Sequence, residues 1–92
     1  MSAQLNIFKT QMITVKIECF GAVERLLPTD LSLQFDKELS IVEALDYVSR
    51  TYPDAAQMIE RCACAMGEDI IPRQTLVTAD CSLVLLSPVA GG

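Results

Sequence analysis

The sequence contains no histidine and no tryptophan, few basic residues, and no long apolar run. Without histidine or a C-x-x-C spacing, the four cysteines form no recognisable zinc site. Seven Lys and Arg against twelve Asp and Glu give a net charge of -5, which argues against nucleic acid as a partner. The missing apolar run argues against a membrane span and a secretory signal, so we expect a cytoplasmic protein with reduced thiols.

The cysteines are most simply interpreted as small apolar core residues. Cys62 and Cys64 would share one side of a strand, so a role for these thiols stays open. The other two are Cys19 and Cys81.

Hydrophobic residues make up 51% of the 92 residues, which suits one compact domain. Apolar side chains alternate with polar ones over residues 12–20 and 31–35, and this predicts two antiparallel strands. Ser40 and Glu43 form a capping box at the start of the main helix, which Pro53 ends. We expect Asp54 to cap a short second helical segment through Ile59.

The chain then returns to strands. We expect a short strand at residues 62–66 and an edge strand at Ile70 and Ile71. We also expect a central, fully covered strand at residues 82–86. The coarse order β-β-α-β-β predicts an α+β fold, with a mixed sheet packed on one main helix and parallel first and last strands.

The last six residues, Ser87 to Gly92, attract attention because a buried strand runs directly into Pro88 and ends in Gly91 and Gly92. Proline favours an extended exit from the domain, and glycine lets a backbone enter a narrow cleft. The α-carboxyl of Gly92, with a reference pKa near ~3.5, is ionised and can attack an activated phosphate. A Gly-Gly end alone would also fit an accidental disordered end. Its place after the last strand of this sheet order makes the functional interpretation more specific.

The chain resembles the MoaD family, the small subunit of molybdopterin synthase, over residues 12–92. The similarity is clearest in residues 20–26 (FGAVERL), 40–45 (SIVEAL) and 88–92 (PVAGG). MoaD and the thiamine carrier ThiS are sulfur carriers of the β-grasp (ubiquitin-like) fold, and the Pro-Val-x-Gly-Gly ending favours MoaD. The resemblance implies a β-grasp domain at 12–86, a flexible tail at 87–92, and an N-terminal extension of unknown role at 1–11.

The resemblance also implies a sulfur-transfer cycle. An activating enzyme uses ATP to adenylate Gly92, and a sulfur-donor protein converts the product to a thiocarboxylate. The tail then enters the large synthase subunit, which transfers the sulfur to a pyranopterin precursor of the molybdenum cofactor. The chain would be a non-catalytic subunit that binds no metal, cofactor or membrane by itself.

The implied site has three parts. The reacting residue is Gly92. The tail residues inserted into the partner are Ser87, Pro88, Val89, Ala90 and Gly91, and the positions that match the family's apolar docking patch are Phe20, Ile70 and Leu86. Leu86 stands where the family often has an aromatic residue, and Ser87 where a second proline is frequent. The alternatives are a carrier for thiamine or another metabolite, a ubiquitin-like protein modifier, and a non-catalytic interaction domain.

Overall fold

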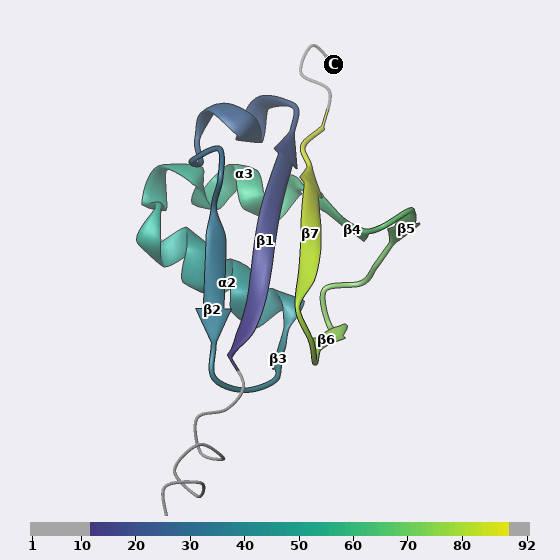
Figure 1. Cartoon of the computed structure of the whole chain (residues 1–92). Helices are drawn as coiled ribbons and strands as arrows, with labels where there is room; N and C mark the ends of the chain where they lie inside the picture. Colours follow the sequence, from purple (N-terminus) through teal and green to yellow (C-terminus); the bar gives the residue numbers. More distant parts are fainter. Residues whose placement is uncertain (1–11, 89–92) are drawn as a thin grey trace, which may run out of the picture.

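The chain folds into a five-stranded mixed sheet with its helices on one face, as a computed structural model describes for residues 12–88 (Figure 1). The sheet order is β2 (Ser32–Phe35), β1 (Ile13–Phe20), β7 (Cys81–Leu86), β4 (Ala63–Met66) and β5 (Asp69–Ile70). Strand β1 pairs parallel with β7 and antiparallel with β2, and β4 pairs antiparallel with both β7 and β5. The α+β prediction and the parallel pairing of the first and last strands are confirmed.

Helix α2 (Ile41–Thr51) begins as the capping box predicts. The Glu43 N–H donates to Ser40 Oγ at 3.2 Å, and the Ser40 N–H donates to Glu43 Oε1 at 2.9 Å. Two further N–H groups of the first turn, those of Ile41 and Val42, donate to carbonyls of residues 75 and 73 at 3.0 Å. The backbone donors that a helix start leaves free therefore find partners, which fixes where α2 starts against the sheet.

The predicted cap at Asp54 is wrong. A 3-10 turn, η2 (Pro53–Ala55), lies between α2 and α3 (Ala56–Arg61), and neither element has a side-chain cap. Proline at the first position of η2 has a fixed φ that suits a helical start, so Asp54 lies inside the turn instead of before it. The residue before α3 is Ala55, whose backbone is already helical.

The prediction that β7 is fully covered is also wrong, although the strand is central. Leu83 and Leu85 are fully buried, whereas Ser82 is exposed and Val84 and Leu86 are half-buried. The alternation arises because the helices cover one face of the sheet and leave the other face open (Figure 1). The apolar run therefore correctly predicted a central strand, but it did not show whether one or both faces of that strand are covered.

Two very short strands were missed. Strands β3 (Leu39–Ser40) and β6 (Leu76–Val77) form a separate two-stranded sheet. Two residues are too few to display an alternating pattern, so the sequence holds no periodic signal for them. A further 3-10 turn, η1 (Ala22–Arg25), follows β1. Among residues 12–88, none of the helices is long and apolar enough to cross a membrane.

Candidate functional site

The open face of the sheet gathers apolar side chains from four strands. Residues opposite each other in a ladder point to the same face, and Leu86 of β7 lies between Phe20 of β1 and Ala63 of β4. The next row of the same face runs from Val84 through Ala65 to Ile70 of β5. We call Phe20, Ala63, Ile70, Val84 and Leu86 the open apolar face.

The three predicted docking residues share this face, although they come from β1, β5 and β7. Phe20 is 51% exposed and Ile70 is 65% exposed, while Leu86 is half-buried between its two neighbouring strands. Large apolar side chains that cluster in the open are typical of surfaces that bind a partner. The clustering fits the predicted docking role, which stays a prediction.

Ser87 ties the root of the tail to the end of β1. Its backbone N–H and its Oγ–H both donate to the Phe20 carbonyl oxygen, at 3.1 and 2.9 Å. In return Ser87 Oγ accepts the N–H of Val23 in η1 at 3.2 Å. We call these three hydrogen bonds the Ser87 latch. The latch joins segments 64 or more residues apart, and it holds Ser87 beside Phe20, one residue before the end of the described part of the chain.

Gly21 makes the latch possible. Its φ of 90° lies in the region that side chains disfavour, and a Cβ added there would lie 2.3 Å from Ser87 Oγ. In the sequence Gly21 directly follows the predicted strand at residues 12–20. Its contact with Ser87 was missed because no local pattern links two residues so distant in the chain.

We expect Gly21→Ala to destabilise the fold by about 1–3 kcal/mol, the usual cost of a strained backbone, and to displace the Ser87 hydroxyl. Ser87→Ala should cost about 0.5–2 kcal/mol, as the loss of a helix-capping hydroxyl does. Urea unfolding measures both. Ser82→Ala is the matched control, because Ser82 is an exposed serine on the same strand. Stabilities of all three variants equal to that of the parent would show that the latch contributes nothing.

Of the other predicted tail residues, only Pro88 lies within the described residues, and it is exposed. Val89, Ala90, Gly91 and Gly92 lie outside them. The structure therefore describes the surface around the root of the tail, and the assignment of Gly92 as the reacting residue stays a prediction.

The cysteines are poor candidates for nucleophiles. All four are free thiols; Cys62 and Cys64 are buried, and Cys19 and Cys81 are half-buried. Burial raises the pKa of each thiol. For Cys62, burial and the neighbouring Cys19 and Cys64 raise the pKa to about 11, against the opposing charge of Arg73. Such thiols stay protonated at neutral pH, and the thiolate is the reactive form.

Metal binding finds no support in the described part of the chain, which holds no group of three or more side chains suited to a metal ion. Arg73 has a structural task there. Its guanidinium donates to the carbonyl oxygens of Ile59 and Cys62 at 2.7 and 2.8 Å, and so caps the end of α3.

Comparison with known proteins gives one family and one fold. The model of the ThiS family matches residues 17–92. The crystal structure of the small archaeal modifier protein 1 of H. volcanii is similar to the chain, with a TM-score of 0.72 at 13% identity, over 84% of this chain and 99% of that one. A crystal structure of SAMP1 from Haloferax volcanii gives 0.71 at 16% identity, over 86% and 99%. None of the curated proteins that were compared matches. The two structures confirm the predicted β-grasp, ubiquitin-like fold.

Proposed function

The chain belongs to the ThiS family of ThiS/MoaD-like β-grasp proteins, and we propose that it carries sulfur as a thiocarboxylate on Gly92 for molybdenum cofactor synthesis. The observation that carries this proposal is the position of Gly91 and Gly92. The family match extends through both glycines, and Gly92 follows in the sequence six residues after Leu86, where the central strand β7 ends.

The chemistry needs little from this chain besides a reachable carboxylate. In the active site of an activating enzyme, a Gly92 carboxylate oxygen attacks the α-phosphate of ATP, and pyrophosphate leaves. A persulfide of a donor protein then attacks the acyl carbon and displaces AMP. A thiol cleaves the resulting acyl disulfide, which leaves the thiocarboxylate on Gly92 and a disulfide on the proteins that supplied the sulfur. Glycine suits this position because no side chain hinders the acyl carbon.

In this proposal, residues of the domain position the tail so that the sulfur on Gly92 can be transferred in the active site of a partner. The open apolar face would dock on the large subunit of molybdopterin synthase, and the Ser87 latch would fix where the tail leaves the docked surface. The tail would then reach the partner's active site, where sulfur passes to the pyranopterin precursor. The PVAGG ending, close to the Pro-Val-x-Gly-Gly of MoaD, favours this acceptor over thiamine.

A second candidate function is protein modification, in which Gly92 forms an isopeptide bond with lysines of other proteins. Its support is the fold likeness to the structure of a protein named small archaeal modifier protein 1. The same activated carboxyl group would serve both outcomes, so the acceptor of the acyl group distinguishes them.

Intact mass spectrometry of the native protein tests the proposal. We expect a fraction of the protein to carry one oxygen exchanged for sulfur, resistant to thiol reductants and located on Gly92 by fragmentation. The same mass increase, relative to its own unmodified mass, should appear on a variant with all four cysteines replaced by alanine, because burial raises the pKa of these thiols and keeps them unreactive. Branched peptides between Gly92 and lysine on other proteins, without thiocarboxylate on the free chain, would favour the modifier instead. Sulfur found only on cysteine would overturn both.

A further inference from the structure

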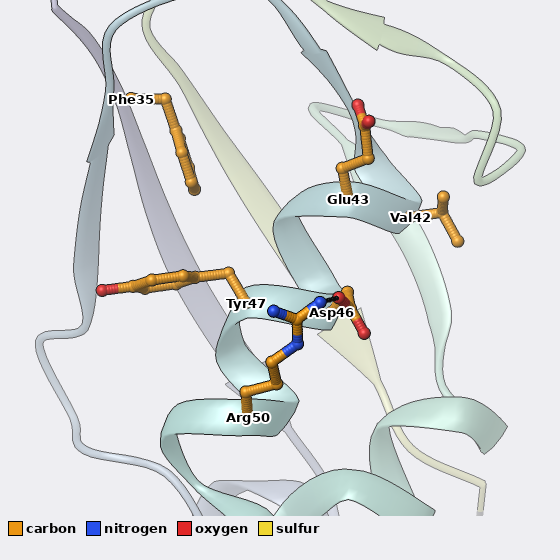
Figure 2. A pocket seen from close by; sticks show the side chains of 6 residues that line it. All are labelled: Phe35, Val42, Glu43, Asp46, Tyr47 and Arg50. Carbon is orange, nitrogen blue, oxygen red and sulfur yellow. Dashed lines mark hydrogen bonds and ion pairs between the residues drawn. The ribbon is translucent and has the colours of Figure 1, made fainter.

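A hollow of about 620 Å³ lies between β2 and α2, away from the open apolar face (Figure 2). Phe35 of β2 and Tyr47 of α2 form its apolar wall, with their rings edge to face and the ring centroids 5.9 Å apart. Val42 and Tyr47 are half-exposed, at 49% and 51%. We call this the β2–α2 hollow.

The rim of the hollow has more acidic than basic side chains. Glu43, Asp46 and Arg50 complete its lining, and Arg50 pairs with Asp46 one helical turn away (Figure 2). A smaller hollow beside it shares Phe35 and Glu43 and adds Asp36 and Glu38 with one lysine. An apolar wall with a mainly acidic rim suits a short segment that has apolar side chains and a positive charge.

Strand β2 is one of the two outermost strands of the five-stranded sheet, and its partner in that sheet is β1. Outer strands present unpaired backbone groups, and proteins commonly cover them with another segment of the chain. The hollow thus lies where a sheet of this kind needs a cover.

We infer that residues 1–11 of this chain occupy the β2–α2 hollow. The segment enters the fold at the start of β1, where Ile13 is the direct cross-strand partner of Phe35 in the wall of the hollow. Within four residues it supplies three large apolar side chains, Leu5, Ile7 and Phe8, which Lys9 follows, and it contains no acidic residue. Apolar side chains would cover the two rings, and Lys9 would meet the acidic rim.

Residues 1–11 are long enough to reach the β2–α2 hollow, and weak contacts are enough to hold them there. At about 3.3 Å per extended residue, the five steps along the chain from Phe8 to Ile13 span up to about 16 Å. Neighbouring strands are only about 4.8 Å apart, so this length can cross from β1 past β2 to the hollow. Because the segment is tethered beside its site, the effective concentration is in the millimolar range, and weak apolar contacts suffice to hold it. The inference does not depend on sulfur carriage.

Nuclear Overhauser effects in the full-length protein test the inference directly. We expect cross-peaks between the methyl groups of Ile7 and the ring protons of Phe35 and Tyr47. Replacing Leu5, Ile7 and Phe8 together by serine should remove these contacts and shift the amide signals of the hollow. The matched control replaces Gln4, Asn6 and Gln11 by serine, which should leave those signals in place. Tyr47→Ser removes one ring from the wall of the hollow, so the cross-peaks between Ile7 and Phe35 should weaken or disappear in this variant as well.

Three results would overturn the inference. The first is the absence of cross-peaks between the segment and either ring. The second is an equal effect of the apolar and polar triple replacements on the amide signals of the hollow. The third is cross-peaks that appear only between chains in a mixture of labelled and unlabelled protein, because the occupant would then be a second copy.

Discussion

Deleting Gly92, or adding one alanine after it, is expected to abolish thiocarboxylate formation and to leave the fold intact. The reacting carboxylate must lie at a fixed distance from the docked domain, and an error of about 1 Å in a reacting group can cost about 100-fold in rate. One residue changes the reach by about 3.3 Å. The loss should therefore be complete within the sensitivity of an intact-mass assay with activating enzyme, ATP and a sulfur donor.

The control separates tail length from general damage. One alanine added before Met1 alters the chain length equally, yet it leaves the reach from β7 to Gly92 unchanged. This variant should accept sulfur as the parent does, and all variants should give the same urea unfolding curve. If the chain extended after Gly92 still accepts sulfur without being trimmed, the carboxylate of Gly92 is not the acceptor.

The strands and the main helix were predictable because their signals are local. Ile13, Val15 and Ile17 alternate with polar residues on β1, and Ser40 with Glu43 marks the start of α2 within four residues. Each pattern reflects a contact made by neighbours in the sequence, so the chain alone displays it.

The features that were missed depend on contacts between distant segments. The Ser87 latch needs Phe20 and Val23 to lie beside the last strand, and no spacing in the sequence announces this. Asp54 failed as a cap because Pro53 had already started a 3-10 turn. The apolar run of β7 suggested two covered faces, whereas half of its side chains form part of a surface that the helices do not cover.

Three of the five residues of the open apolar face were predicted, but their arrangement on one face was not, because it depends on contacts between distant strands. Family resemblance picked out Phe20, Ile70 and Leu86, but only the ladder registers place these side chains in adjacent rows of one face. Ala63 and Val84 complete that surface and were not singled out. An alternating pattern shows which residues of one strand share a face, while the register between strands decides which strands meet there.

Replacing Phe20 or Ile70 by aspartate is expected to weaken binding to the large subunit by about 2 kcal/mol or more, the range of central interface anchors. That loss corresponds to about 30-fold in the dissociation constant. The added carboxylate would have to lose its hydration water inside an apolar contact, and burying an unpaired charge in this way costs free energy. Both side chains are more than half exposed, so the fold itself should change little.

Isothermal titration calorimetry of each variant against the purified large subunit measures the effect. Leu76→Asp is the matched control, because Leu76 is 60% exposed but lies on β6 in the separate two-stranded sheet. It places the same charge on a comparably exposed leucine away from the open apolar face, so its affinity should equal that of the parent. Equal affinities for the Phe20 and Ile70 variants and the parent would place the docking surface elsewhere. Equal losses for all three variants would show that added negative charge, and not the apolar contact, controls the complex.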